Sequence, residues 1–91
     1  MDPIPYTDAL ESARSRAREV LAAMPRTKIV TEEADYLAAE VRSALFRFVD
    51  DVELAFDDDA KVIHFRSASR IGYSDLGVNR KRMQRIREAL S

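Results

Sequence analysis

The stretch Leu45-Phe46-Arg47-Phe48-Val49-Asp50-Asp51-Val52-Glu53-Leu54-Ala55-Phe56 decides the fold, because apolar and charged side chains alternate along it. Such a period of two predicts a β-strand with one buried face. That face carries Phe46, Phe48, Val52, Leu54 and Phe56. Asp50 shares it, while Arg47, Asp51 and Glu53 take the other face. We expect one long strand, because a hairpin turning at Asp50-Asp51 would mix the two faces and Asp-Asp is a poor two-residue turn.

The next strand is expected to pair with this one through a four-residue connection at 57–60. On the buried face this register pairs Phe56 with Lys61, Leu54 with Ile63, Val52 with Phe65 and Asp50 with Ser67. On the outer face it sets Glu53 beside His64 and Asp51 beside Arg66. Both outer pairs combine an acid with a basic or hydrogen-bonding side chain, which supports the register independently of the apolar pattern.

Two further strands are expected before the long one, which makes a meander from Thr27 to about Ser69. A turn at Ser43-Ala44 pairs Val41 with Phe46, Ala39 with Phe48 and Glu40 with Arg47. A strand over 27–31 then turns through 32–34 and places Ile29 beside Leu37.

Helical periodicity appears at both ends of the chain. The first helix is predicted to begin at Thr7 or Asp8, where Asp8 and Glu11 resemble a capping box, and to end before Pro25. Its apolar stripe is Leu10, Ala13, Ala17, Val20, Leu21 and Met24. The last helix is predicted to have Ser74 as its N-cap and a stripe of Leu76, Asn79, Met83, Ile86 and Leu90.

The predicted fold class is α+β, in the order α-β-β-β-β-α. We expect a two-layer sandwich, in which the N- and C-terminal helices cover one face of a four-stranded antiparallel meander. The covered face includes Phe46, Phe48, Val52, Leu54, Ile63 and Phe65. At 91 residues the chain fits a single domain over 1–91, with residues 1–6 as an N-terminal extension.

Composition excludes several kinds of site. The chain has no cysteine, which excludes disulfides, thiolate metal sites and thiol nucleophiles. A single histidine, His64, excludes any site that needs two imidazoles. The net charge of -1 gives no general attraction to nucleic acid or anionic membranes, and we expect neither a metal nor a cofactor. No signal peptide is visible at 1–5, so we expect a cytoplasmic location, or envelope association where an N-terminal segment has been removed.

Two stretches, at 42–53 and 66–80, together resemble a known family. They read Arg42-Ser43-Ala44-Leu45-Phe46-Arg47-Phe48-Val49-Asp50-Asp51-Val52-Glu53 and Arg66-Ser67-Ala68-Ser69-Arg70-Ile71-Gly72-Tyr73-Ser74-Asp75-Leu76-Gly77-Val78-Asn79-Arg80. The family is the domain-of-unknown-function family fourteen ninety-nine, found in bacteria and plastid-bearing organisms. The resemblance covers the chain from Tyr6 onward and implies homology but no activity. Many members look longer at the N-terminus, with a short cysteine-containing segment and sometimes a membrane or export signal, and we expect this chain to lack that segment.

Asp50 is the residue that most needs an explanation, because a carboxylate on an apolar face requires hydrogen bonds or a cation. We interpret it as part of a structural network that pins the segment 66–80, in which it accepts bonds from Ser67 and from backbone amides at 72–74. The alternative is a binding pocket at the same place. The candidate binding residues are Asp50, Ser67, Ser69, Tyr73, Ser74, Asn79 and Arg80, with Arg66 and Arg70 on the outer face.

The outer-face arginines have two interpretations. Arg66 and Arg70 lie with Arg47 and either form an anion-binding stripe or pair with Asp51 and Glu40, and pairing is favoured. His64 is predicted on the face opposite Asp50 and Ser67, which argues against a Ser-His-Asp triad, so no residue is assigned a catalytic role.

The leading functional hypothesis is a non-catalytic binding or accessory module for a small anionic ligand or a protein partner. An enzyme that uses Asp50 as an acid or base is the second hypothesis. The third is a nucleic-acid binder, because residues 66–91 hold 7 basic and 2 acidic side chains and the last helix is basic, although no aromatic platform accompanies it.

Overall fold

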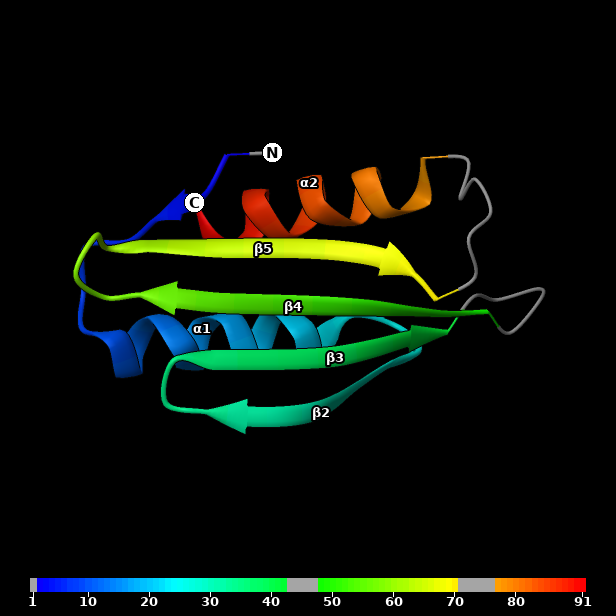
Figure 1. Cartoon of the computed structure of the whole chain (residues 1–91), viewed down its shortest axis with the longest axis horizontal. Coiled ribbons are helices and arrows are strands. Elements are labelled where there is room, and N and C mark those ends of the chain that lie inside the picture. The colour runs from blue at the N-terminus through cyan, green and yellow to red at the C-terminus, as the bar shows by residue number, and fades with distance from the viewer. Residues whose placement is uncertain (1, 43–47, 71–76) are drawn as a thin grey trace.

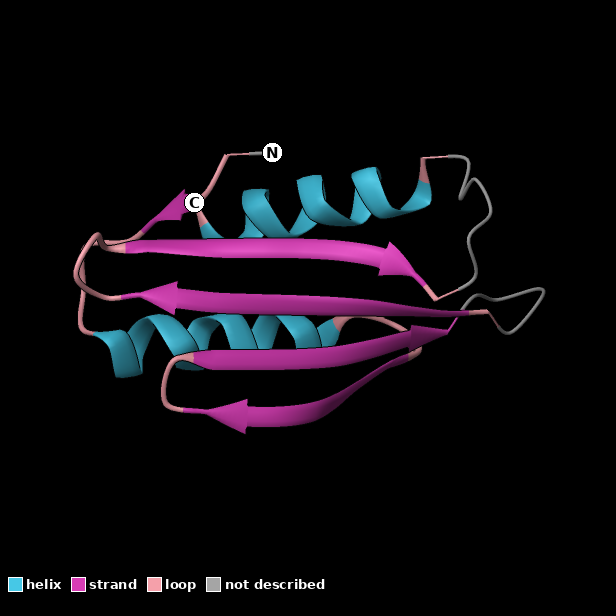
Figure 2. Ribbon diagram, in the orientation of Figure 1, coloured by secondary structure: helices cyan, strands magenta, loops and turns pink. Residues whose placement is uncertain are grey.

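The computed structural model describes residues 2–42, 48–70 and 77–91. Its elements, in chain order, are β1 (Ile4–Pro5), α1 (Leu10–Ala23), β2 (Thr27–Glu33), β3 (Tyr36–Arg42), β4 (Val49–Asp57), β5 (Val62–Ser69) and α2 (Val78–Leu90). All neighbouring strands are antiparallel, in the order β1-β5-β4-β3-β2, and both helices lie on one face of the sheet (Figures 1 and 2). The α+β class, the meander and the one-sided helices are therefore confirmed. The sheet has five strands where four were expected.

The core fills the space between the sheet and the two helices. Leu37, Val52, Leu54 and Ile63 are at most 1% exposed on the covered face of the sheet, and Ile86 of α2 is fully buried against them. Each such side chain contributes about 1.5–3 kcal/mol through its removal from water. From α1 the fully buried residues are Ala13, Ala17 and Leu21, which confirms the predicted stripe. The two alanines allow α1 to approach the sheet closely.

The N-terminal residues belong to this core. Ile4 is 1% exposed and pairs with Ile63, while the ring of Tyr6 packs edge-on against Phe56, with 6.2 Å between the ring centroids. Within the predicted N-terminal extension at 1–6, Ile4 and Tyr6 thus contribute side chains to the core. A two-residue strand next to prolines shows no periodicity, and Pro5 is tolerated there because β1 is an edge strand.

The first helix begins later than predicted. It starts at Leu10 after the N-cap Ala9, and no side chain caps it. The predicted capping box is wrong, because the Asp8 carboxylate forms an ion pair with Arg16 two turns along. The end of α1 at Ala23, ahead of Pro25, is as predicted. Arg26 follows with a left-handed backbone (φ 55°), which turns the chain into β2.

The register between β4 and β5 differs from the prediction by two residues. Asp50 lies opposite Ser69, Val52 opposite Ser67, Leu54 opposite Phe65 and Phe56 opposite Ile63. On the outer face Glu53 lies opposite Arg66 and Asp51 opposite Ala68, so the predicted pairs Glu53–His64 and Asp51–Arg66 are wrong. The faces are nevertheless correct, because a shift of two preserves them. The connection is 58–61, one residue later than expected: the Asp57 carboxylate accepts a bond from the Ala60 amide (3.1 Å), and Lys61 takes a left-handed conformation.

The pairing of β3 with β4 departs further from expectation. Val41 lies opposite Asp50, Ala39 opposite Val52 and Leu37 opposite Leu54, so the predicted pairs with Phe46, Phe48 and Arg47 are wrong. This offset places two buried apolar pairs between the strands. The strand begins at Val49, and Phe48 is 39% exposed where burial was expected. Residues 43–47, which include the predicted turn and Phe46, lie outside the described residues.

The edge strand β2 is longer than predicted and irregular. It continues to Glu33, and Ile29 lies opposite Ala39 where Leu37 was expected. The predicted turn at 32–34 therefore lies mostly inside the strand. A β-bulge between Ile29 and Thr31 leaves Val30 without a partner in the register, and the Val30 side chain is 48% exposed.

The second helix lies beside α1 and runs in the opposite direction (Figure 1). It begins at Val78 with Gly77 as its N-cap, and the predicted N-cap Ser74 lies outside the described residues. Gly77 has φ 82°, a left-handed conformation that glycine adopts without strain. Asn79, Ile86 and Leu90 are the buried residues of α2, as the predicted stripe requires.

Candidate functional site

Asp50 is buried on the helix-covered face of the sheet, as predicted, with 5% of its surface exposed. Both carboxylate oxygens have a partner. The Ser69 hydroxyl donates to Oδ1 at 2.8 Å, and Nη1 of Arg82 donates to Oδ2 at 2.8 Å. The side chains of Asp50 and Arg82 are only 8% and 10% exposed, so this is a buried ion pair. Removal of both charges from water is costly and is offset only by such close, hydrogen-bonded geometry.

Three more side chains complete the arrangement around Arg82. Nη1 of Arg82 also donates to the Ser67 hydroxyl (3.0 Å) and to the Asn79 side-chain carbonyl (2.7 Å). The Asn79 amide donates to Ser69 Oγ at 3.2 Å, and the Ser67 hydroxyl donates to Asn79 Oδ1. We call Asp50, Ser67, Ser69, Asn79 and Arg82 the Arg82 network. It joins β4, β5 and α2 through side chains alone.

Sequence reasoning located four members of this network and missed the fifth. The predicted neighbours Ser67, Ser69 and Asn79 do gather near Asp50, but the hydroxyl that donates to Asp50 is that of Ser69 and not of Ser67. The predicted backbone donors at 72–74 lie outside the described residues. Arg82 was not among the predicted binding residues. Its position three residues after the buried Asn79 was the available signal, because residues three apart share a helix face.

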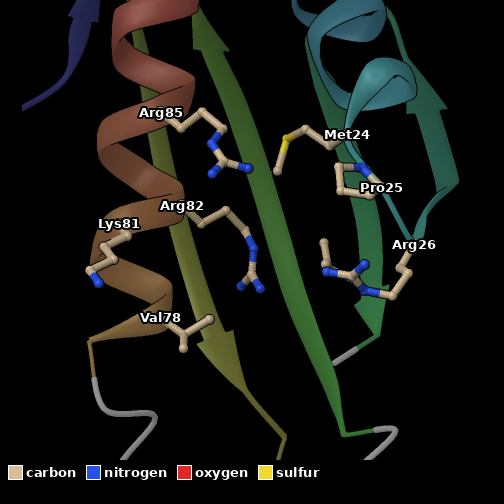
Figure 3. A pocket seen from close by; sticks show the side chains of 8 residues that line it. Met24, Pro25, Arg26, Val78, Lys81, Arg82 and Arg85 are labelled. Atoms are coloured by element: carbon tan, nitrogen blue, oxygen red, sulfur yellow. The ribbon is translucent and has the colours of Figure 1, made fainter. Parts of the chain in front are cut away.

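A cleft with a volume of about 220 Å³ opens beside the Arg82 network, between the start of α2 and the junction of α1 with β2. Its described lining residues are Met24, Pro25, Arg26, Val41, Val78, Lys81, Arg82 and Arg85. Arg82 and Arg85 extend from α2 towards Met24, Pro25 and Arg26, whereas Lys81 extends away from them (Figure 3). We call this the basic cleft. The helical period explains it, because Val78, Arg82 and Arg85 form the stripe next to the buried one.

The charges in the basic cleft are not balanced. Half of its eight described lining residues are arginine or lysine, and none is acidic. Arg82 is neutralised by Asp50. Arg26 donates from Nε to the Arg42 carbonyl at 3.0 Å, a neutral partner. Across residues 2–42, 48–70 and 77–91, no carboxylate lies within ion-pair distance of Arg26, Lys81 or Arg85.

The predicted outer-face residues lie apart from this site. Arg70 bonds to both carboxylate oxygens of Asp51 (2.9 and 2.8 Å) and forms an ion pair with Glu40. The Arg70 guanidinium lowers the pKa of the Asp51 carboxyl. Arg66 lies 3.5 Å from a Glu53 oxygen. The favoured interpretation, in which Arg66 and Arg70 pair with Asp51 and Glu40, is confirmed for Arg70, whereas the acid beside Arg66 is Glu53.

The remaining predicted residues are distributed as follows. Arg80 is exposed on α2 and does not line the basic cleft, and Tyr73 and Ser74 lie outside the described residues. His64 is exposed on the outer face, where it lines a shallow hollow of about 180 Å³ with Tyr36, Glu53 and Arg66. His64 therefore lies too far from Asp50 and Ser67 to form a triad with them, which agrees with the prediction that His64 lies on the opposite face. Among the described residues, no group of three or more histidine, aspartate and glutamate side chains could hold a metal ion.

Within the same residues, neither helix has the length and apolar character needed to cross a bilayer. Comparison with known proteins gives one match: the family described as "Protein of unknown function (DUF1499)" matches residues 1–90. No curated protein and no solved structure matches the chain.

Proposed function

The chain belongs to the DUF1499 family, and on that premise we propose that it is a non-catalytic binding module that holds a small anionic ligand in the basic cleft. The observation that carries this proposal is the surplus of positive charge in the cleft. Arg26 and Arg85 are directed at a hollow without an acidic lining residue among those described, and Lys81 also lines it, with a side chain that extends away from Arg26 (Figure 3). By contrast, Arg16, Arg18, Arg66 and Arg70 each form an ion pair with a carboxylate.

The guanidinium groups are suited to this role. An arginine presents a planar fork of donors that matches a carboxylate or phosphate, and it holds water less strongly than an ammonium group does. Arg82 is fixed in place by Asp50, Ser67 and Asn79, and only its Nη1 takes part in these bonds. A side chain that is already ordered loses little entropy when a ligand binds.

A binding role is favoured over catalysis through Asp50. Both oxygens of Asp50 are engaged, and Asp50 is not among the residues that line the basic cleft. The described lining offers no carboxylate, imidazole or hydroxyl group that could act as a general base. Asp50 supports the cleft indirectly by holding Arg82.

Nucleic-acid binding is disfavoured by the way α2 uses its basic side chains. Arg82 is buried in the network, and the Arg87 guanidinium lies over the ring of Phe65 at 5.4 Å. Two of the basic residues of the helix are thus turned towards the protein, which leaves a discontinuous basic surface. Tight binding to a phosphate backbone requires several such contacts in a row.

The proposal is tested by isothermal titration of the whole chain with small anions at constant ionic strength. Inorganic phosphate, butyl phosphate and pentanoate are the probes. We expect saturable binding of at least one of them, weakened about tenfold or more by Arg85→Gln, because a charged hydrogen bond is removed. The matched control is Arg80→Gln, an exposed arginine of the same helix that lies outside the cleft.

Equal weakening by Arg80→Gln and Arg85→Gln would show that only the general charge of α2 matters. No saturable binding to any of the three anions would overturn the proposal. Binding to a single-stranded oligonucleotide that is tighter than to any small anion would favour the nucleic-acid hypothesis instead.

A further inference from the structure

We infer that the anionic group of the ligand is a phosphate monoester on a short apolar body. This inference rests on the proposed function and deepens it. It draws on three properties of the basic cleft: the amount of unbalanced charge, the directions from which the arginines approach, and the apolar part of the lining.

The unbalanced charge favours a dianion. Arg26 and Arg85 leave two positive charges directed at the cleft after Arg82 is neutralised by Asp50, whereas the Lys81 side chain extends away from Arg26 (Figure 3). A carboxylate supplies one negative charge, whereas a phosphate monoester carries nearly two at neutral pH because its second pKa is about 6. The dianion is therefore the better electrostatic complement.

The arginines approach the cleft from two walls. Arg26 is fixed on one side by its left-handed backbone and by its bond to the Arg42 carbonyl, and Arg85 reaches in from α2 on the other (Figure 3). A carboxylate is planar and has two oxygens, and one guanidinium fork bonds both of them. A phosphate monoester is tetrahedral and presents three terminal oxygens, so forks from opposite walls can each bind it.

The rest of the lining is apolar. Met24, Pro25, Val41 and Val78 provide hydrocarbon surface, and Val78 is 47% exposed although it faces the cleft. Exposed apolar surface beside a cluster of cations fits a ligand with an apolar body and a charged head. The volume of about 220 Å³ is small, which favours a body of a few carbons.

The decisive comparison is butyl phosphate against pentanoate, which share a similar chain and differ in the head group. At pH 8, where the ester is a dianion, we expect butyl phosphate to bind about tenfold tighter or more. Inorganic phosphate lacks the body and is expected to bind more weakly than butyl phosphate. Pentanoate binding as tightly as butyl phosphate would overturn the inference while leaving the proposed function intact, whereas the absence of binding to all three would overturn both.

A pair of valine variants tests the role of the apolar body. Val78→Ser is expected to weaken butyl phosphate about fivefold, through lost apolar contact, and to leave inorganic phosphate unchanged. The matched control Val30→Ser changes an equally exposed valine on the edge strand β2 and is expected to change neither. Equal loss for both probes in Val78→Ser would contradict an apolar contact at this position.

A monoester phosphate could also come from a lipid headgroup, and a third arm separates the two sources. Phosphatidic acid has a monoester headgroup, whereas the headgroup of phosphatidylglycerol is a diester. Co-sedimentation of the protein with phosphatidic acid vesicles alone would support the inference and indicate a lipid source. Binding of butyl phosphate without vesicle binding would support it with a soluble source. Equal retention on both kinds of vesicle would overturn recognition of the monoester.

Discussion

The two ends of the sheet hold their polar side chains in different ways. At the end where β4 turns into β5, the Tyr6 hydroxyl donates to Asp58 at 2.8 Å, and Lys61 donates to the same Asp58 oxygen at 2.9 Å while lying 5.2 Å from the centre of the Tyr6 ring. We call Tyr6, Asp58 and Lys61 the N-terminal anchor. At the other end stands the Arg82 network, in which the ion pair is buried.

The two ends differ in whether each charge has an opposite partner. This criterion separates charges that serve folding from charges available to a ligand. In the N-terminal anchor every charge has an opposite neighbour near the surface, where such pairs are worth about 1 kcal/mol or less. In the Arg82 network the pair is enclosed, and cations without a carboxylate partner collect beside it. The functional proposal depends on this contrast between the two ends of the sheet.

Asp50→Asn is expected to have the largest effect. It leaves the Arg82 charge buried without a counter-charge, which costs about 3–5 kcal/mol in the free energy of unfolding. Urea denaturation measures the loss. The control is Asp59→Asn, an exposed acid at the opposite end of the sheet, and it is a better control than Asp58→Asn because Asp58 bonds both Tyr6 and Lys61. A loss below about 1 kcal/mol for Asp50→Asn would mean that the buried ion pair contributes no more to stability than the exposed pair at the other end of the sheet.

Tyr6→Phe is expected to have an intermediate effect, a loss of about 1–2 kcal/mol, because it removes one hydrogen bond to a carboxylate. Burial, and then the bond to Asp58, raise the pKa of Tyr6 from 10.0 to about 12. A raised pKa means that the stabilisation is complete below pH 10 and is lost as the pH rises towards 12. Denaturation across this window should show a steeper alkaline loss in the wild type than in Tyr6→Phe. Identical slopes of stability against pH in the wild type and in Tyr6→Phe would contradict a stabilising role of the Tyr6 hydroxyl.

Phe48→Ala is expected to have the smallest effect, about 1 kcal/mol or less, because Phe48 is 39% exposed at the network end of β4. Loss of a fully buried phenylalanine would cost about 3–5 kcal/mol. Thermal and urea denaturation distinguish these outcomes. A loss of about 3–5 kcal/mol would show that the apolar core extends beyond Val49 to Phe48. The two ends of the sheet would then differ less than proposed.

The sheet faces could be predicted from the sequence, whereas the strand offsets could not. Alternation assigns Val52 and Leu54 to the core, but any shift of two residues preserves that assignment. In the observed register, the turn between β4 and β5 contains the bond from the Ala60 amide to Asp57 and the left-handed Lys61. Such conformations are uncommon for residues other than glycine, and no turn motif marked this one.

The candidate site was predictable in part for a related reason. An aspartate on an apolar strand face indicates a buried polar group. Ser67, Ser69 and Asn79 were within reach of Asp50 in the predicted and in the observed register. Arg82 and the basic cleft depend on how α2 rests on the sheet, which is a tertiary property. A helix rich in arginine does not reveal in its sequence which arginine points inward. The need of Asp50 for a cation was the remaining clue.

The bulge in β2 bears on how the molecule behaves at high concentration. An outer strand with an unbroken row of backbone donors and acceptors can recruit a strand from another copy, which is a common start of aggregation. In β2 the bulge at Val30 breaks that row, and Lys28, Glu32 and Glu33 place charges along the same strand. Deletion of Val30 would remove the bulge, and we expect it to make strand addition between copies easier.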